Sequence, residues 1–598
     1  MLNTTCSIRA TARRSTPRIC RNIVSKARNH ARTATHAYAD TKKQHFVRSV
    51  AVVITLASIA TAWQWTRDKS IFREVHAEEP ALEPEPEFEK ARRRPRDEED
   101  NRTIISSQHL QVKKSWEKPG VYSWGSNSGR VAAPDSQESF IKTPSRIRFF
   151  DGMLLRDIKL DRNFAAAVDE KGDLIQWGIG FSKETTQPTY TLRGKNLISV
   201  ALSRDRLIAL SARGDVYSIP VSQAEQSAGP KPVSASWIPF WGSSENGISY
   251  RVRTPQSLGW NERVTHISSG LEHALLLTSS GRVFSLASGT EDYPTKGQLG
   301  IPGLTWESRP TGAFDMPHEI STLKGFPVAK IATGDYHSLV SDAAGRAFAF
   351  GDNSAGQLGF ENVEAVHIDA PSLLPTQRLY SGTGRQASVT NVFAGGNTSF
   401  MTIEAVKPSR SPRDSDRITA DLWAFGFGLT GQLGTGRWVH NQTSPTKVPA
   451  FSGLFEYDEH TSSVVPIKLA YLSVGANHAA GVLDNVASVS VLGKSRKTTE
   501  NDTNWGRDIL FWGNNEFYQI GSGKRNNVSA PTYLQPLDQA AEAERAAGAL
   551  GWGKQKMEKE MHRFQITPKA KVKIGERWVN MEQKVECGRG VTAVYSAV

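Results

Sequence analysis

The chain has 598 residues and a formal net charge of +13, with 49 glycines and 15 tryptophans. Residues 1–48 carry eleven Lys or Arg and one acidic residue, so the rest of the chain carries only +3. A duplex-binding protein usually has a basic face, and this nearly neutral body gives no support for a nucleic-acid partner. Because only Cys587 lies outside the basic N-terminus, the three cysteines exclude a disulfide framework and a cysteine-based zinc site.

The first segment, 1–47, is rich in Arg, Ser, Thr and Ala and almost free of acidic residues. This composition is typical of a mitochondrial presequence. A disordered basic tail is the alternative. We favour the presequence because an uncharged apolar segment follows directly.

Residues 48–67 are predicted to form a single transmembrane helix. No charge interrupts the apolar run between Arg48 and Arg67, and Trp63 and Trp65 lie at one end, where interfacial aromatic residues are favoured. The run spans roughly 27 Å as a helix, which is just enough for a bilayer core. A buried core helix is the alternative, but the segments on both sides are polar.

A linker of alternating charge, 68–112, follows the predicted membrane helix. Its first part alternates Glu with Pro, and an arginine cluster at 92–96 then meets four acidic residues at 97–100. Such a composition cannot bury enough apolar surface to fold. The arginine cluster resembles a nuclear signal, but the adjacent acids favour a solvated charge run.

From Val121 onward the chain repeats one pattern, most clearly over residues 328–359. A strand leads to a Gly-x-x-His turn, an apolar strand, a Gly turn, a strand ending in an aromatic residue and Gly, and then Gly-Gln-Leu-Gly. The first and the third strands of this pattern each occur seven times. The residues predicted to hold the repeats together are Trp124, Gly125, Trp177, Gly178, His273, Gly297, His337, Gly351, Gly356, Gly426, Gly431, His478, Trp512 and Gly513.

Short alternating strands bounded by Gly turns predict four-stranded antiparallel blades. The large aromatic residue before Gly would fill the space between neighbouring blades. The chain begins with a late-blade strand at 121–125 and ends with early-blade strands at 584–596. We therefore expect the two ends to share one blade, which would close a ring and remove exposed sheet edges.

These copies resemble the regulator of chromosome condensation family over residues 113–598. The resemblance implies an all-β, seven-bladed propeller of four-stranded blades. Two copies depart from the pattern, because Ile219-Pro220 and Leu286 stand where Trp-Gly or its equivalent is expected. Five ranges are predicted to be long loop insertions, namely 221–259, 360–387, 405–420, 485–507 and 537–569.

His273, His337 and His478 recur at equivalent positions of three repeats. Three histidines on one ring could suggest a metal, but equivalent positions on different blades are usually too far apart for bonds near 2 Å. A structural role between repeats is the stronger interpretation. The sequence has no phosphate loop, no His-Glu-x-x-His and no Gly-x-Ser-x-Gly. We therefore predict no catalytic residue, no cofactor and no metal.

The insertion between Asp538 and Phe564 has many alanines and is predicted to be helical. Met557, Met561 and Phe564 are candidates for binding a partner there. A helix lying on its own propeller is an equally good interpretation.

The family resemblance extends to a fungal mitochondrial inner-membrane member linked to assembly of respiratory complex III. It implies a non-enzymatic interaction scaffold, whose partner would be an inner-membrane protein complex or its assembly intermediates. The alternative is a guanine-nucleotide exchange factor for a mitochondrial GTPase, and chromatin binding conflicts with the presequence. Charge around the predicted helix favours the intermembrane space for the propeller, whereas soluble relatives in the family suggest the matrix.

Overall fold

The structure, a computed structural model, describes residues 108–231, 247–361, 365–409, 417–458, 463–485, 488–489, 503–549 and 562–598. The predicted presequence (1–47), membrane helix (48–67) and most of the linker lie outside the described residues. Among the residues that are described, no helix is long and apolar enough to cross a membrane.

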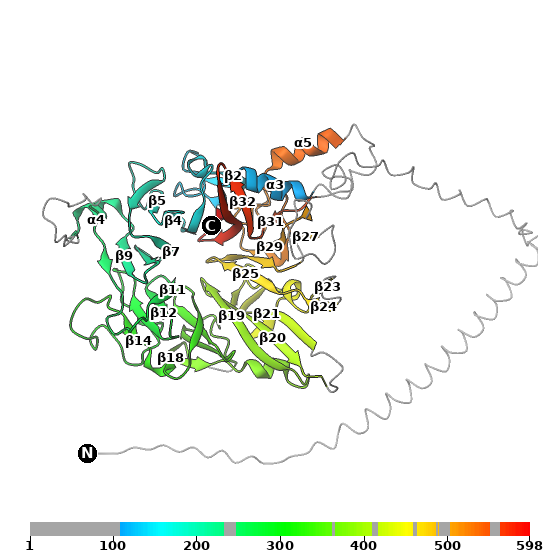
Figure 1. Cartoon of the computed structure of the whole chain (residues 1–598). Coiled ribbons are helices and arrows are strands. Elements are labelled where there is room, and N and C mark those ends of the chain that lie inside the picture. The colour runs from blue at the N-terminus through cyan, green and yellow to red at the C-terminus, as the bar shows by residue number, and fades with distance from the viewer. Residues whose placement is uncertain are drawn as a thin grey trace, which may run out of the picture. The chain divides into compact units, whose positions relative to one another are not determined.

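Strands grouped in fours dominate the described part of the chain, as the repeat predicts (Figure 1). Four sheets contain four consecutive strands each. They are β7 (Leu197–Leu202), β8 (Arg206–Ser211), β9 (Val216–Pro220) and β10 (Arg251–Val252); β11 (Val264–Ser269), β12 (His273–Thr278), β13 (Val283–Ala287) and β14 (His318–Glu319); β15 (Val328–Thr333), β16 (His337–Asp342), β17 (Ala347–Asp352) and β18 (His367–Leu373); and β19 (Gln386–Gly395), β20 (Thr398–Lys407), β21 (Arg417–Gly428) and β22 (Val439–Lys447).

A further sheet has the same four-strand order with one added strand. It contains β25 (Leu469–Val474), β26 (His478–Leu483), β29 (Arg507–Gly513) and β30 (Val528–Thr532), with β31 (Gln565–Ile566) paired to β29. Two small hairpins, β23 (Phe455–Asp458) with β24 (Ser463–Pro466) and β27 (Ser488–Val489) with β28 (Thr503–Asn504), accompany it.

The remaining sheet has nine strands and contains both ends of the repeat region. Its strands are β1 (Val121–Ser126), β2 (Phe140–Arg146), β3 (Leu155–Leu160), β4 (Ala165–Asp169), β5 (Leu174–Trp177), β6 (Thr189–Leu192), β32 (Ala570–Ile574), β33 (Arg577–Cys587) and β34 (Val591–Ala597). One parallel pair, Leu155 with Ala597, joins the group β3–β6 to the group β33, β34, β1 and β2. The described residues therefore contain seven groups of four strands.

The predicted pairing of the chain ends is confirmed. β34 lies between β1 and β33, with Val121 opposite Tyr595 on one side and Cys587 opposite Thr592 on the other. All seven residues of β34 are buried. The C-terminal strand thus completes a sheet that the first strand of the repeat region begins.

The apolar core is divided among the contacts between neighbouring groups, which is what a propeller requires. One cluster joins Leu275 and Val283 of one sheet to Val340 and Phe350 of the next. A single blade cannot bury both of its faces, so each depends on its neighbour.

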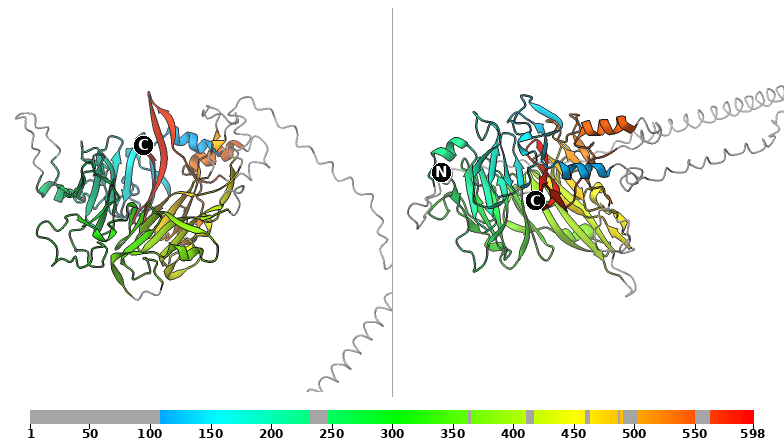
Figure 2. Two further views of the ribbon diagram at one scale, coloured as in Figure 1. Left: turned by 60° about the horizontal axis from the view of Figure 1, so that its bottom comes forward. Right: turned by 45° about the horizontal axis from the view of Figure 1, so that its top comes forward.

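The first strand of each group lines a central channel. Residues near the ends of β3, β7, β11, β15, β19, β25 and β33, together with the turns that follow them, surround one cavity. We call the end of the ring that carries these turns the mouth face. The opposite end is the α3 face, because helix α3 (His109–Glu117) leads into β1 there, and α5 (Gln539–Ala549) follows β30 there (Figure 2).

Two predicted insertions contain the outer strand of a blade, so these predictions were wrong in part. The range 221–259 includes α4 (Gln223–Ala228) and β10, and 360–387 includes β18, the 3-10 helix η3 (Thr376–Tyr380) and the start of β19. Outer strands such as β18 are half exposed along their length. They therefore lack the apolar alternation that marks the inner strands.

Other predicted boundaries also move. The range 405–420 is the end of the long β20–β21 hairpin rather than a separate loop. The linker end predicted at residue 112 falls inside α3, whose Val112 is buried against the propeller. In the last insertion, the predicted helix is confirmed only over α5. Three further 3-10 turns are η1 (Arg148–Phe150), η2 (Ser321–Leu323) and η4 (Pro449–Phe451).

Candidate functional site

The three recurring histidines connect neighbouring blades. Each begins the second strand of its group and is fully buried. Each ring Nε2 lies at hydrogen-bond distance from a hydroxyl oxygen in the next group. These pairs are His273 with Ser338 at 2.9 Å, His337 with Ser399 at 2.8 Å and His478 with Thr592 at 2.7 Å.

The hydroxyl partners fix which imidazole nitrogen carries the proton. The Thr592 hydroxyl donates to the backbone carbonyl of Gln519 at 2.6 Å, and Ser399 donates to Gln357 at the same distance. A hydroxyl has one hydrogen to give, so it must accept from the histidine, whose Nε2 is therefore protonated. Burial lowers the pKa of His273 and His478 to about 3. The rings are thus neutral at physiological pH.

The tryptophan of the aromatic-Gly pair also contacts the neighbouring blade. Trp512 Nε1 donates to the backbone carbonyl of Gln432 at 2.8 Å, and Trp124 makes the same bond to Gln519 at 2.8 Å. Gln432 belongs to the Gly-Gln-Leu-Gly turn that begins at Gly431, and Gln519 belongs to an altered copy of this turn, Tyr518-Gln-Ile-Gly521. Trp177 donates instead to Val131 at 3.0 Å.

The predicted glycines have backbones that require glycine. Each adopts a positive φ, from 75° at Gly297 to 115° at Gly125. This left-handed region is strained for residues with a Cβ. The same conformation occurs at the other predicted positions, Gly178, Gly351, Gly356, Gly426, Gly431 and Gly513.

Replacing Gly434 by Ala should destabilise the blade junction more than the same change two residues later. Gly434 and Gly436 have φ values of +68° and +79°, so both substitutions strain the backbone. Only at Gly434 would the new Cβ meet Trp512, 2.8 Å from Nε1; nothing lies within 4 Å of the Cβ at Gly436. We expect Gly434→Ala to cost ~1–3 kcal/mol more, measured by urea unfolding of both variants. Equal costs would show that the Trp512 contact contributes nothing.

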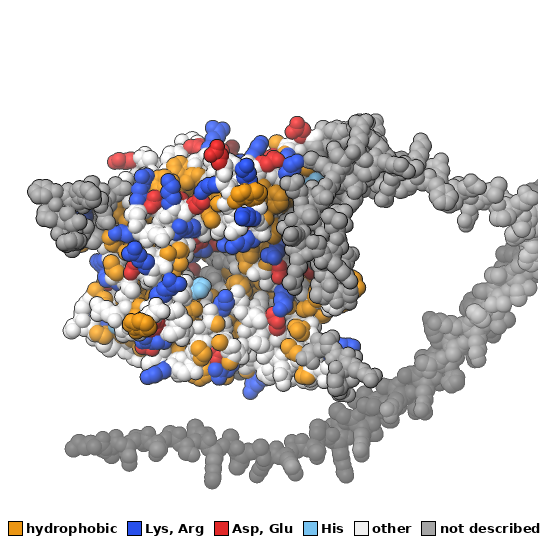
Figure 3. Space-filling model, viewed as in Figure 1, with side chains coloured by type: hydrophobic (Ala, Val, Ile, Leu, Met, Phe, Trp, Pro, Cys, Tyr) orange, Lys and Arg blue, Asp and Glu red, His pale blue; other side chains and the backbone are white. Residues whose placement is uncertain are grey.

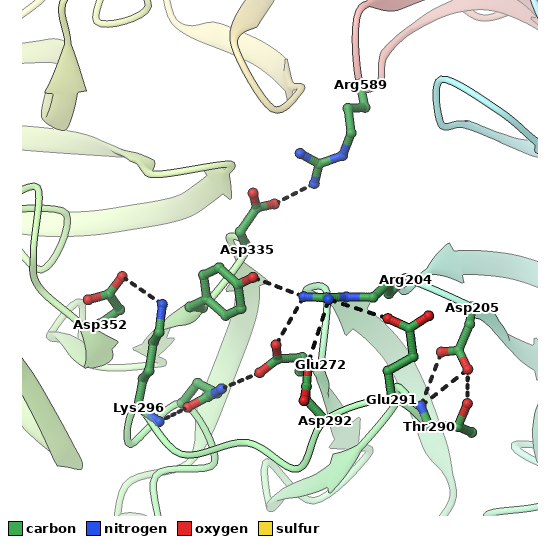
Figure 4. A network of polar contacts seen from close by, with 12 residues as sticks. Arg204, Asp205, Glu272, Thr290, Glu291, Asp292, Lys296, Asp335, Asp352 and Arg589 are labelled. Atoms are coloured by element: carbon green, nitrogen blue, oxygen red, sulfur yellow. Dashed lines mark hydrogen bonds and ion pairs between the residues drawn. The ribbon is translucent and has the colours of Figure 1, made fainter. Parts of the chain in front are cut away.

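Charged side chains that follow the first strands of five groups gather at the mouth of the channel, and Figure 4 shows most of them. Arg204 Nη2 donates to Glu272 at 3.1 Å and to the hydroxyl of Tyr336 at 3.0 Å. Arg589 reaches from the last blade to Asp335 at 2.7 Å and to Asp161 at 3.3 Å. The turn after β33 is therefore bound to the turns after β15 and β3.

The charges of this network depend on one another. Burial alone would lower the pKa of Arg589, but Asp335 and Asp161 raise it above its ordinary value. Burial raises the pKa of Glu272, and Arg204 opposes that rise. The cavity below has a volume of ≈ 320 Å³. The arrangement can accept charged groups of a partner by exchanging these internal ion pairs for external ones.

Sequence reasoning missed the mouth residues, although Glu272, Asp335 and Tyr336 occupy the variable positions of the Gly-x-x-His turns. Their shared place in this turn is the signal that could have found them. Among the described residues, no group of three or more His, Cys, Asp or Glu side chains could hold a metal ion. Large apolar side chains are exposed in loops that leave the mouth-face ends of strands. They are Trp306, Leu429 and Trp438, at 49%, 51% and 54% exposure.

The predicted partner-binding residues are not brought together as a surface. Phe564 is 2% exposed and belongs to the core, and its backbone N–H donates to Leu534 at 2.8 Å. Its side chain is unavailable to a partner, so that prediction was wrong. Met557 and Met561 lie outside the described residues.

Comparisons with known proteins agree with the repeat. The model of the regulator of chromosome condensation (RCC1) repeat matches residues 328–357. Protein FMP25, mitochondrial, of Saccharomyces cerevisiae is 28% identical over 449 residues, covering 70% of this chain and 67% of that protein. RCC1 domain-containing protein RUG3, mitochondrial, of Arabidopsis thaliana is 22% identical, and the match covers 60% of this chain and 71% of that protein. The crystal structure of human WBSCR16 has 17% identity and a TM-score of 0.49, covering 80% of this chain and 99% of that one.

Proposed function

Because the chain belongs to the RCC1 repeat family, we propose that it is a non-enzymatic interaction scaffold of mitochondria. The similarity to two mitochondrial proteins supports this location. The basic, acid-poor segment 1–47 supports it independently. We also propose that the nine-stranded sheet is two blades, which gives a closed ring of seven.

The scaffold proposal rests on one observation about the described residues: the repeated residues are buried between blades, and other residues are exposed in the loops. The repeated His, Trp and Gly residues are used between blades, where no partner can reach them. Three exposed apolar side chains, Trp306, Leu429 and Trp438, and the paired charges lie instead in loops of the mouth face. Exposed aromatic side chains rimmed by polar groups mark protein–protein contact surfaces.

We propose that the scaffold acts at the inner membrane, in assembly of respiratory complex III. The uncharged run within 48–67 supports membrane attachment. If so, the full-length protein should remain in the pellet when mitochondria are extracted with alkaline carbonate. Release into the supernatant would contradict the anchor.

Mitochondria lacking the protein should contain incomplete complex III on native gels. Normal amounts of mature complex III, with normal incorporation of its late subunits, would contradict the assembly role. An exchange factor predicts a different outcome, in which the purified protein accelerates nucleotide release from a mitochondrial GTPase and complex III assembles normally.

The mouth face can be tested with paired substitutions in the full-length protein. Trp306→Ala combined with Trp438→Ala should leave the protein folded and abundant but fail to restore complex III in the deletion strain. Trp260→Ala is the control, since this side chain is 99% exposed and lies in the loop between β10 and β11, at the α3 face. Full restoration by the double variant would exclude this part of the mouth face.

A further inference from the structure

The β32–β33 hairpin projects from the α3 face and exposes a tryptophan between lysines. Its two strands pair from Ala570–Met581 to Ile574–Arg577, and only the second half of β33 joins the propeller sheet. Lys573 is directly opposite Trp578, and Lys571 is opposite Asn580, so these four side chains share one face of the hairpin. Trp578 is 62% exposed.

The hairpin contacts the rest of the described chain next to its turn and at its base. Arg577, next to its turn, makes a bidentate pair with Glu170 of the first blade, at 2.7 and 2.5 Å. At its base, the Thr567 hydroxyl lies 2.7 Å from that of Ser115 in α3. Bidentate Arg–carboxylate pairs restrict orientation. These contacts connect the hairpin to the first blade and to α3.

Positive charge is concentrated where α3 and the hairpin meet. Residues 108–118 and 569–584, which we call the α3–hairpin surface, contain eight Lys or Arg and three acidic residues. This net +5 exceeds the +3 of the whole chain beyond residue 48. The side chains of Lys113, Lys114 and Lys118 in and after α3 are exposed, as are Lys571 and Lys573. Figure 3 shows Lys and Arg side chains around an apolar patch in this region.

We propose that the α3–hairpin surface binds the anionic phospholipid surface of the membrane to which the chain is anchored. This inference rests on the proposed membrane attachment. Residues 68–107 separate the predicted membrane helix from the described chain, which begins one residue before α3. The α3–hairpin surface is therefore the part of the propeller closest to the anchor along the chain.

The chemistry of this surface fits lipid better than an acidic protein. Trp is favoured at the membrane–water boundary because its ring is amphipathic. Each Lys or Arg close to an anionic leaflet contributes about 1 kcal/mol. A flat, mobile array of phosphates can satisfy separated lysines without a matching pocket. On the hairpin, Lys571 Nζ is 5.9 Å from the centroid of the Trp578 ring. The positive charge and the aromatic ring can therefore contact the same membrane surface together.

A polarity-sensitive fluorophore at residue 580 tests this proposal in the full chain. Cys6 and Cys20 are replaced by Ser, Asn580→Cys carries the probe, and buried Cys587 is kept. The protein is reconstituted in phosphatidylcholine vesicles with or without cardiolipin. We expect a blue shift only with cardiolipin, lost in high salt and in Lys571→Glu/Lys573→Glu. The same probe at Leu429→Cys, on the mouth face, should not respond.

Several outcomes would overturn the proposal. No shift at residue 580 in cardiolipin vesicles, while carbonate shows the anchor inserted, would reject lipid binding without affecting the anchor or the scaffold role. An equal shift in neutral vesicles would reject anionic recognition. A shift in detergent that grows with protein concentration would identify a second copy of the chain as the occupant. Failure of the anchor itself would appear separately, as release by carbonate.

Discussion

Deleting residues 588–598 is expected to unfold the whole propeller rather than to lower its stability slightly. The deletion removes β34, whose seven residues are buried and which pairs with β1, β33 and β3. Burying a side chain such as Val594 or Tyr595 contributes about 1.5–3 kcal/mol, and a domain has only ~5–15 kcal/mol in total. Two open sheet edges would remain.

A graded comparison separates loss of the strand from loss of one hydroxyl group. Thr592→Val keeps β34 but removes the hydroxyl that bonds His478 and the Gln519 carbonyl. It should cost about 1–3 kcal/mol and preserve a single cooperative transition. Thermal and urea unfolding of the full-length protein, monitored by circular dichroism, measures both variants. A deletion variant that still melted cooperatively near the original temperature would contradict a shared terminal blade.

Lowering the pH from 7 to 5 is expected to destabilise the propeller strongly. Burial lowers the pKa of His273 and His478 to about 3 and that of His337 to about 4. In the unfolded chain each binds a proton below about 6.5. Protons therefore favour the unfolded state, and stability is lost as the pH falls from 6.5 towards these folded values. Each histidine contributes ~2 kcal/mol of this loss at pH 5.

Other groups act mainly in a lower range of pH. Burial would raise the pKa of Glu262, but hydrogen bonds from Ser280 and Thr278 lower it to about 2. The stability that this carboxylate contributes is therefore lost only below pH 4.5. Burial raises the pKa of Glu272 and of Glu586, so each carboxyl binds its proton more tightly in the folded protein than in the unfolded chain. Near the ordinary pKa of a glutamate, their protonation therefore stabilises the fold and opposes the effect of the histidines.

The test is the free energy of unfolding in urea at several pH values between 7.5 and 5. His478→Gln should be less stable at neutral pH but should lose stability less steeply, by about one proton, on acidification. A free energy that stayed constant between pH 7 and 5, or an unchanged slope in the variant, would mean that these rings can be protonated in the folded state.

The inner architecture could be predicted because each junction is encoded locally. The contacts between neighbouring blades use residues of three local motifs, namely the Gly-x-x-His turn, the aromatic residue before Gly and the Gly-Gln-Leu-Gly turn. The bond from Trp512 to Gln432 joins two of these motifs across a blade boundary. Their recurrence in order therefore predicts the sheet order as well as the strands.

What could not be predicted depends on contacts between unrelated positions. β14 has two residues and β18 is half exposed, so hydrogen bonding to the neighbouring strand, rather than composition, places them in a sheet. Phe564 is predicted to end an alanine-rich helix that either binds a partner or lies on its own propeller. The hydrogen bond of its backbone to Leu534 instead holds it in the core. Arg204, Asp335 and Arg589 meet only once the ring is formed.

The sheet that contains β1 can be completed only when β34 pairs with β1 and β33. The hydrogen bond from the Gly120 backbone to Ser596 spans 476 residues, so the sheet containing β1 cannot be completed before the segment around Ser596 is available. Pairings so distant in sequence form slowly. Before residues 591–597 are available, β1 can pair only with β2, and a chain that lacks them exposes an open sheet edge to aggregation and proteolysis. Residues 588–598 therefore couple the two ends of the repeat region, because only a chain that contains them can close this sheet.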